Sequence, residues 1–514
     1  MQFFIIAIIL VLHFPCCSFS QDVKQQREFD IIFVVLSQYG TFHDRRVNLF
    51  KDSLLKAGDS ESDLKFQVLA THEVFPEFWG SFAVWPLAKT LISRYEHKTR
   101  WMMVCEEETR VDLKKLRSYL SKLDSNSPMY IGRGLVDTDI TIIHHYAFAT
   151  SDSDLHTFRY PDFATGVLFS VGALRLLSDN AAKKFSRGRS DFTIDPKHET
   201  ALMLANSDGH TKLSKTTASN KLMMTSDASA FCSHNLLRAE TDVDKCVTYY
   251  LGESYRTQCN NNPAVRDRDV YIAVKTYSAY HKSRIVVVKR TWGSKRWNIE
   301  YFSDVEDLYI PTVRLANISN TERGHCAKTL TIMRRFFVAD TDAVRHTPNW
   351  LVIADDDTLL SVPRLLRLLR CYNADSSRPE PVILGERYAY GLSETGHTGY
   401  EYPTGGSSMV FNRLAVEQLL EKSRCSCPSN DSPDDMIIGM CARDSNIHVT
   451  HHDGFHQNRP QDYAPELLVR QPQPISFHKH TDIDPYTVYE SMLKDTVGDD
   501  DTEVVEPNAF HEEL

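Results

Sequence analysis

The sequence predicts an α/β fold built from two copies of one domain. Short apolar runs such as 350–354 suit strands that are buried on both faces, and helical patterns such as the leucines at 365–369 separate them. The run from Trp101 to Thr109 mirrors the run from Trp350 to Thr358 residue for residue, and each carries three consecutive acids. A chain of 514 residues is long enough for two such domains.

Further pairs of segments keep the same order and approximate spacing in the two halves, which argues for an internal duplication. They pair Asp30–Val35 with Asp269–Val274, His43 with His281, Pro128–Gly132 with Pro381–Gly385, Tyr160–Pro161 with Tyr402–Pro403, and His198–Glu199 with Asp434–Asp435. The predicted domains are therefore 28–205 and 265–495. The stretch 206–264 is interpreted as a linker that leads to a bridging helical segment.

Both ends of the chain carry targeting features. An apolar run at 3–14 followed by small residues predicts a signal peptide at 1–20, with a signal-anchor as the alternative. The acidic tail 496–514 ends in His511-Glu-Glu-Leu, which resembles the KDEL/HDEL signal bound by a retrieval receptor, unless the match is a chance acidic ending. Together they predict a soluble protein of the endoplasmic reticulum lumen, with no membrane span after signal cleavage.

Composition narrows the function further. The net charge of −10 offers no basic surface for nucleic acid. Removing the signal peptide would take two of the 11 cysteines and leave an odd number in an oxidising compartment. Cys105, inside an apolar strand, is the expected free thiol, and the other eight could form four disulfides whose pairing stays open. Asn317 begins a candidate glycosylation sequon.

Three consecutive carboxylates, Asp355–Asp357, follow the apolar strand at 350–354. Ligands of open α/β sheets bind at the carboxyl ends of strands, and like charges gather there only when a cation or donors stabilise them. We therefore predict a divalent-metal site for a phosphate-bearing ligand. Asp357 is best placed to bind the ion, Asp355 or Asp356 would reach the nucleotide sugar or a water, and His478 could complete the shell. The alternative is an acidic turn that caps the next helix.

Two other segments suit catalysis. Pro433 and the paired acids Asp434 and Asp435 precede an apolar run, as at a helix N-terminus, and one acid could act as general base or simply cap the helix. Gly405 and Gly406 let the backbone approach a ligand closely, although a tight turn would use the same glycines. Basic residues at 289–290 could contact a pyrophosphate or form a solvated helix end.

The two copies differ where chemistry would occur. The first has Glu106–Glu108 in place of the three aspartates and lacks a counterpart of the late histidine cluster at 478–480. An extra methylene displaces each carboxylate by more than the tolerance of metal geometry. We expect the second copy to be catalytic and the first to be a binding or scaffolding copy.

These motifs carry a family resemblance. The chain resembles the fringe-type β-1,3-glycosyltransferases at Arg290–Gly293, Asp355–Asp357, Gly405–Gly406 and Pro433–Asp435, in this order. The resemblance implies a GT-A fold in both copies, a UDP-sugar donor, Mn²⁺ as the metal and inversion at the anomeric carbon. The duplication and the two targeting features narrow it to enzymes that use UDP-glucose to extend O-linked fucose on thrombospondin type 1 repeats.

Roles implied by the resemblance fall on particular residues. Asp357 and His478 would hold the metal, with Asp355 and Asp356 near the donor; Asp435 would be the base and Asp434 the runner-up. Thr276, Arg290 and Asp304 would line the nucleotide pocket. Rival hypotheses are a related galactosyl- or N-acetylglucosaminyltransferase, and a non-catalytic lumenal chaperone or lectin on the same fold.

Overall fold

A computed structural model describes residues 27–495. Positions 62, 146–156, 186–190, 206–221, 234–244, 251–258, 260, 295, 316–317, 319–324, 339–346, 374–378, 422–424, 430 and 471–472 are left out of the description. The predicted signal peptide, the acidic tail and the Asn317 sequon lie outside the described residues. In the described part, no helix combines the length and the apolar character needed to cross a bilayer.

The first half contains a six-stranded sheet of order β10-β5-β8-β3-β1-β2. Its strands are β1 (Ile31–Val35), β2 (Phe66–Ala70), β3 (Trp101–Cys105), β5 (Tyr130–Gly132), β8 (Val167–Ser170) and β10 (Thr225–Ser226). The main helices are α1 (Thr41–Glu61), α3 (Val84–Tyr95), α4 (Leu113–Leu120), α7 (Val171–Phe185) and α8 (Pro196–Ala205). Residues of β1 and β3 are fully buried because helices cover both faces of the sheet.

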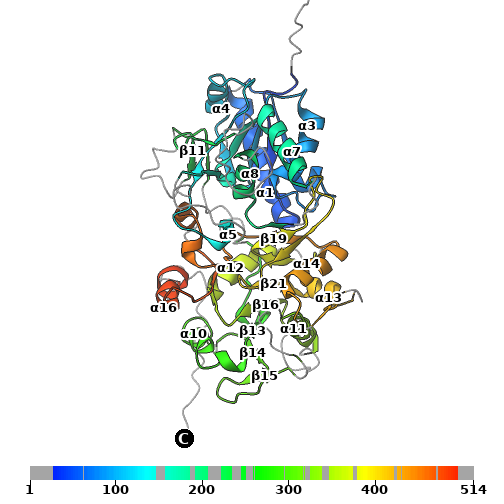
Figure 1. Cartoon of the computed structure of the whole chain (residues 1–514), viewed down its shortest axis with the longest axis vertical. Coiled ribbons are helices and arrows are strands. Elements are labelled where there is room, and N and C mark those ends of the chain that lie inside the picture. The colour runs from blue at the N-terminus through cyan, green and yellow to red at the C-terminus, as the bar shows by residue number, and fades with distance from the viewer. Residues whose placement is uncertain are drawn as a thin grey trace, which may run out of the picture.

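The second half contains a seven-stranded sheet of order β15-β14-β13-β16-β21-β18-β22. Its strands are β13 (Val270–Lys275), β14 (Ile299–Ser303), β15 (Thr312–Arg314), β16 (Trp350–Asp355), β18 (Ile383–Gly385), β21 (Met409–Asn412) and β22 (Val449–His451). The main helices are α10 (Arg284–Arg290), α11 (Cys326–Val338), α12 (Val362–Tyr372), α13 (Arg413–Glu421) and α14 (Asp434–Asp444). Figure 1 shows the two halves stacked along the long axis of the molecule.

The two sheets repeat one strand order. In each sheet one strand pairs in parallel with both neighbours: β1 with β2 and β3, and β13 with β14 and β16. The strand on the far side of β3 or β16, β8 or β21 respectively, pairs antiparallel with it. A short strand after each acidic triplet, β4 (Thr109–Val111) or β17 (Thr358–Leu360), pairs antiparallel with a later strand, β12 (Thr248–Tyr250) or β23 (Ser476–His478). Common descent by duplication remains a prediction that this arrangement supports.

The described part of 206–264 contains strands, so it is more than a linker, and the predicted bridging helical segment falls largely outside the described residues and stays a prediction. It supplies β10 and β12 to the first half, together with β11 (Phe231–Ser233), which pairs with β12. The β-branched and aromatic residues at 248–250 favour a strand, β11 and β12 pair in parallel, and the Cys232–Cys246 disulfide links β11 to the residues just before β12. The first half therefore extends beyond residue 205.

Both halves contribute to the junction between them. Strand β9 (Phe192–Thr193) of the first half pairs antiparallel with β19 (Arg387–Tyr390), which pairs in turn with β20 (Tyr400–Pro403). The Gln38 side chain donates to the His451 carbonyl at 2.9 Å and accepts from the His451 amide at 2.7 Å. In Figure 1, β19 lies at the boundary between the halves, beside α14.

The cysteines follow the predicted count. The four disulfides are Cys232–Cys246, Cys259–Cys371, Cys326–Cys427 and Cys425–Cys441. Cys105 is the free, buried cysteine among the described residues, which confirms that prediction. Burial raises the pKa of its thiol well above the usual range, so the group behaves as a small apolar side chain.

Candidate active site

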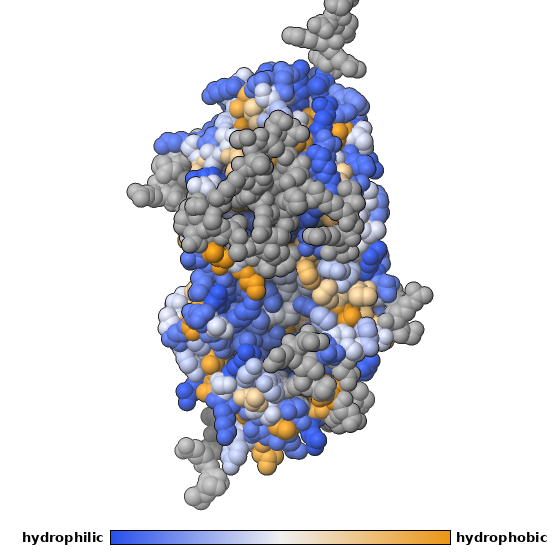
Figure 2. Space-filling model, viewed as in Figure 1, coloured by the Kyte–Doolittle hydropathy of each residue, from blue (hydrophilic) through white to orange (hydrophobic). Residues whose placement is uncertain are grey.

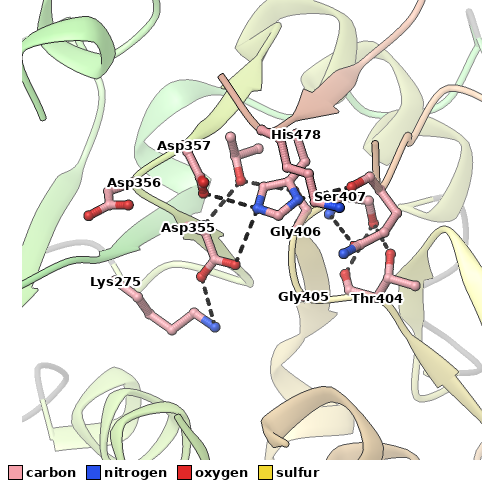
Figure 3. Close-up of polar contacts among 12 residues, drawn as sticks. Lys275, Asp355, Asp356, Asp357, Thr404, Gly405, Gly406, Ser407 and His478 are labelled. Carbon is pink, nitrogen blue, oxygen red and sulfur yellow. Dashed lines mark hydrogen bonds and ion pairs between the residues drawn. The ribbon is translucent and has the colours of Figure 1, made fainter. Parts of the chain in front are cut away.

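The acidic triplet lies where the central strand of the second sheet ends. Asp355 is the last residue of β16, and Asp356 and Asp357 form the turn into β17. Because β17 pairs with β23 in a register that sets Thr358 opposite His478, the histidine is brought against the triplet. Figure 3 shows Asp355, Asp357 and His478 directed toward one another, whereas Asp356 points away from His478.

Asp355, Asp357 and His478 form a group that fits a divalent ion. One ligand atom from each residue lies within 4.8 Å of the others. His478 Nε2 is 2.9 Å from an Asp357 oxygen and 3.9 Å from an Asp355 oxygen. Two carboxylates and one imidazole suit Mn²⁺, which accepts hard oxygen ligands and nitrogen.

The orientation of His478 is fixed by the backbone around it. Its Nδ1 lies 2.9 Å from the Gln457 carbonyl, so a proton on Nδ1 would leave Nε2 free to face Asp357. On the other side Gly406 packs so closely that a Cβ there would overlap the imidazole ring. Although burial favours the neutral ring, the Asp357 carboxylate raises the pKa of His478. The predicted metal ligands are thus held together before any ion binds.

Asp356 belongs to a different part of the cluster. It accepts a hydrogen bond from the Thr276 hydroxyl at 2.7 Å and one from Arg284 at 3.1 Å. Arg284 also forms an ion pair with Asp357 at 2.8 Å. Burial, reinforced by the charge of Asp357, raises the pKa of Asp356 to about 6. The structure therefore joins two predicted donor-binding residues, Thr276 and Asp356, through one contact.

Lys275 connects the acidic triplet to the paired acids of α14. Its Nζ atom lies 3.0 Å from Asp355 and 2.6 Å from Asp434, and its side chain is only 2% exposed. The two carboxylates raise the pKa of Lys275 against the effect of burial, so the ammonium stays charged. The sequence analysis did not identify this residue, because nothing in the local pattern distinguishes a lysine at the end of a strand.

The two acids at the start of α14 have opposite environments. Burial would raise the pKa of Asp434, but the Lys275 ammonium and the Thr329 hydroxyl, at 2.5 Å, lower it. Burial and the Asp434 carboxylate raise the pKa of Asp435 to about 7. Asp435 accepts weakly from the Gly405 amide at 3.4 Å. A carboxylate with a raised pKa is the better proton acceptor, so Asp435 fits the role of base better than Asp434 does.

The remaining predicted donor residues lie at different distances from this centre. Asp304 follows β14 and accepts from the Ser278 amide at 2.8 Å, on the loop that follows Thr276. Arg290 lies at the exposed C-terminal end of α10, and it is Arg284, at the other end of that helix, that contacts the triplet. The paired positions His43 and His281 could have revealed Arg284, because the first-half residue three positions after His43 is also an arginine.

That counterpart, Arg46, contacts the first-half acids. It pairs with Glu107 at 3.3 Å and also with Glu108, and His43 lies 2.8 Å from Glu107. Tyr250 occupies the register position of His478, because it lies opposite Thr109 as His478 lies opposite Thr358. By the same alignment of strands, Leu36 takes the place of Lys275. The first half keeps the acidic turn. At the positions that correspond to His478 and Lys275, however, it has neither an imidazole nor an ammonium group.

The first-half acids face a cavity between the two halves. Its volume is about 210 Å³, and its lining includes Arg46, Glu106–Glu108, Tyr250 and, from the second half, His452. Ligand pockets usually measure about 300–1,000 Å³, so this cavity lies below the usual range. The geometry supports the expectation that the first half is not a second catalytic centre.

A second group of possible metal ligands, Asp137, His144 and His198, is buried in the first half. The two imidazole rings are stacked, with centroids 4.1 Å apart and planes within 2° of parallel. Lone pairs of parallel stacked rings do not converge on one ion. The nitrogens of His144 instead meet Asp137 at 2.8 Å and Asp195 at 3.1 Å, so the group is a hydrogen-bonded buried network.

Comparison with known proteins defines the class. A family model described as Fringe-like matches residues 86–196 and 265–496, which covers parts of both halves. The chain belongs to this Fringe-like family and is a β-1,3-glycosyltransferase.

Individual relatives agree with this assignment. The human protein named beta-1,3-glucosyltransferase is 41% identical over 505 residues, which cover 96% of this chain and 92% of the relative. The mouse protein of the same name is 40% identical and covers 94% and 92%. A solved glycosyltransferase involved in glycosylation of the PBCV-1 major capsid aligns at 14% identity with a TM-score of 0.24, covering 43% of this chain and 98% of its own.

The two neighbouring glycines offer a matched test of the metal site. Gly406→Ala should weaken Mn²⁺ binding about 10- to 100-fold, because the added methyl group displaces the His478 ring. Gly405→Ala should leave Mn²⁺ affinity unchanged, because the nearest atoms to its Cβ would lie at 3.9 Å. Titration calorimetry with Mn²⁺ alone measures both variants. Equal affinity in both would contradict the assignment of His478 as a ligand.

Lys275 provides a second test. Lys275→Met should fold but lower kcat at least about a hundredfold, since it leaves Asp355 and Asp434 without their shared cation. Lys275→Arg, which keeps the charge, should recover part of that loss. Steady-state kinetics at saturating donor measure kcat for both variants, and thermal melting checks that each variant is folded. A methionine variant with near-normal kcat would rule out this role.

Proposed function

We propose that the chain is an inverting, metal-dependent glycosyltransferase with a GT-A fold. In this proposal it moves glucose from UDP-glucose to the 3-hydroxyl of O-linked fucose on thrombospondin type 1 repeats. The observation that carries it is the convergence of Asp355, Asp357 and His478 within 4.8 Å, with the Asp434–Asp435 pair joined to them through Lys275. The printed name of the 41% identical human relative supports glucose as the transferred sugar.

The second half would hold the donor and its ion. Asp357, His478 and Asp355 would ligate Mn²⁺, which when bound neutralises negative charge on the departing diphosphate. Asp356, Thr276 and Asp304 lie on the loops after β16, β13 and β14, where Thr276 contacts Asp356 and Asp304 contacts the loop that follows Thr276. These residues would contact the nucleotide, with Gly405 and Gly406 leaving room for backbone approach.

Asp435 would carry the proton transfer. In an inverting reaction the acceptor hydroxyl attacks the anomeric carbon from the face opposite the leaving diphosphate, and a base removes its proton as the bond forms. Asp435, at the N-terminus of α14, has a raised pKa that matches this task near neutral pH. Asp434, paired with Lys275, would hold the ammonium and the helix end in place instead.

Location and the role of the first half complete the proposal. The predicted signal peptide and the His511–Leu514 ending favour retention in the endoplasmic reticulum lumen through a KDEL-type receptor. The first half would be a non-catalytic domain, since Tyr250 and Leu36 stand where His478 and Lys275 stand in the second. A lectin-like or chaperone role would then describe the first half rather than the whole chain.

A panel of donors and acceptors tests the activity. With Mn²⁺ and a fucosylated thrombospondin repeat, UDP-glucose should be used in preference to UDP-galactose and UDP-N-acetylglucosamine. Asp357→Ala should abolish turnover while the protein stays folded, because one metal ligand is lost. Glu106→Gln, at the first-half counterpart of Asp355, should leave turnover intact. Another sugar used faster than glucose would overturn the donor assignment, and an active Asp357→Ala variant would overturn the metal site.

The base assignment predicts a pH profile. Asp435 accepts a proton only when ionised, and its pKa is about 7, so kcat/KM should fall about tenfold per pH unit below 7. Asp435→Asn should bind UDP normally but lose about 10²–10⁴-fold in kcat. Asp444→Asn, at the exposed far end of the same helix, is the control and should behave as the unmodified enzyme. A fully active Asp435→Asn variant would remove Asp435 as the base.

A further inference from the structure

A row of aromatic side chains crosses the three-stranded sheet that the two halves build together. In the β9-β19-β20 register, Tyr390 lies directly opposite Phe192 on one side and Tyr400 on the other. The ring centroids are 5.0 Å apart for Phe192 and Tyr390, and 6.0 Å apart for Tyr390 and Tyr400. Phe192 comes from the first half, whereas both tyrosines come from the second. We call Phe192, Tyr390 and Tyr400 the aromatic row.

One end of the aromatic row reaches the helix that bears the proposed base. A Cβ at Gly439 of α14 would lie 3.1 Å from the Tyr400 ring, so helix and strand pack in direct contact there. Asp435 lies four residues before Gly439, on the same face of the helix. Strand β20 ends at Pro403, and two residues later the Gly405 amide faces Asp435 at 3.4 Å. Burial, Tyr390 and Asp435 together raise the pKa of Tyr400 to about 12.

The row differs from the aromatics that fill the sheet beside it. Tyr388 and Tyr402, two residues along on the same face, are 7% and 4% exposed and belong to the interior. All three members of the row are only partly buried. Partly exposed rings in contact with one another give a rigid apolar surface with little entropy to lose on binding, as at recognition sites. In Figure 2 the waist between the halves is hollowed, with hydrophobic surface along its margins.

We infer that the aromatic row is the binding surface for the glycosylated acceptor. Tyr400, which packs on α14 one helical turn from Asp435, contacts the apolar face of the fucosyl ring, and Tyr390 and Phe192 contact the polypeptide that carries it. The identity of the acceptor rests on the proposed function. The row extends two ring spacings away from α14, farther than one monosaccharide stacked on Tyr400 would cover. The first half thereby contributes a residue to substrate binding without performing chemistry.

The donor side of the site comes from other elements. Thr276 and Arg284, which contact Asp356, lie after β13 and on α10. The row lies instead on the flank of α14, reached from Asp435 along β20. An acceptor bound on the row therefore approaches the base from a direction that leaves the nucleotide residues uncovered. Changes in the row should alter acceptor binding and spare donor binding.

The test compares a small acceptor with a protein acceptor. Phe192→Ala and Tyr390→Ala should each raise KM about tenfold for a fucosylated thrombospondin repeat and leave KM for p-nitrophenyl fucoside unchanged. Tyr400→Ala should raise KM for both acceptors. Tyr390→Phe, which keeps the ring, should behave as the unmodified enzyme. Tyr309→Ala, at a 97% exposed tyrosine on the loop after β14, is the control and should change neither KM.

UDP-glucose hydrolysis without acceptor and thermal melting accompany each variant. If the unmodified enzyme does not hydrolyse UDP-glucose, the result counts against the proposed function itself. If hydrolysis is normal but no row variant changes the KM for either acceptor, only the binding role of the aromatic row is overturned. Equal losses for both acceptors in Phe192→Ala would also overturn it, because Phe192 is placed beyond the sugar. A lowered melting temperature in an alanine variant is checked with Phe192→Leu, which keeps apolar packing but should still raise KM for the protein acceptor.

Discussion

Repulsion between carboxylates at the end of β16 is the constraint around which the second half is organised. Asp355–Asp357 occupy one turn, and Asp434 approaches the same point from α14. Negative charges this close destabilise one another unless cations lie between them. Lys275 and Arg284 provide that charge from within the chain, each at one oxygen of Asp355 or Asp357. The other oxygen of each carboxylate faces His478, so the fixed cations and the candidate metal site use different oxygens of the cluster.

The first half solves the same electrostatic problem with ion pairs made by its own residues. Arg46 and His43 pair with Glu107, and Arg46 also reaches Glu108, so these longer carboxylates are satisfied internally. Where Lys275 bridges to the paired acids, Leu36 cannot, and the helix position of Asp434 is taken by a histidine. One strand order therefore supports both an internal ion-pair network and an acidic cluster that forms a candidate metal site. The difference lies in a few side chains at the strand ends rather than in the sheet.

Sequence reasoning was effective where a pattern is local. The buried strands, the acidic triplet beside His478, and the free Cys105 follow from short apolar runs, charge clustering and an odd cysteine count. Disulfide pairing and the bridge made by Lys275 depend on which loops meet in space, and no local pattern encodes that. Arg290 was predicted because it belongs to the family motif. Arg284, six residues earlier on α10, instead forms the ion pairs with Asp356 and Asp357. The strands at 225–226, 231–233 and 248–250 were missed because they are too short to show a period, and the bridging helical segment stays a prediction.

The shared sheet gives the first half a structural role even if, as proposed, it performs no chemistry. Strand β9 pairs with β19, β19 pairs with β20, and β20 packs so closely on α14 that only glycine fits at position 439. A displacement of β9 would therefore be transmitted by backbone hydrogen bonds and close packing to the helix that begins with Asp434 and Asp435. The position of the proposed base depends on contacts that cross the junction between the halves. Selection for that position would preserve the fold of the first half whether or not that half performs chemistry of its own.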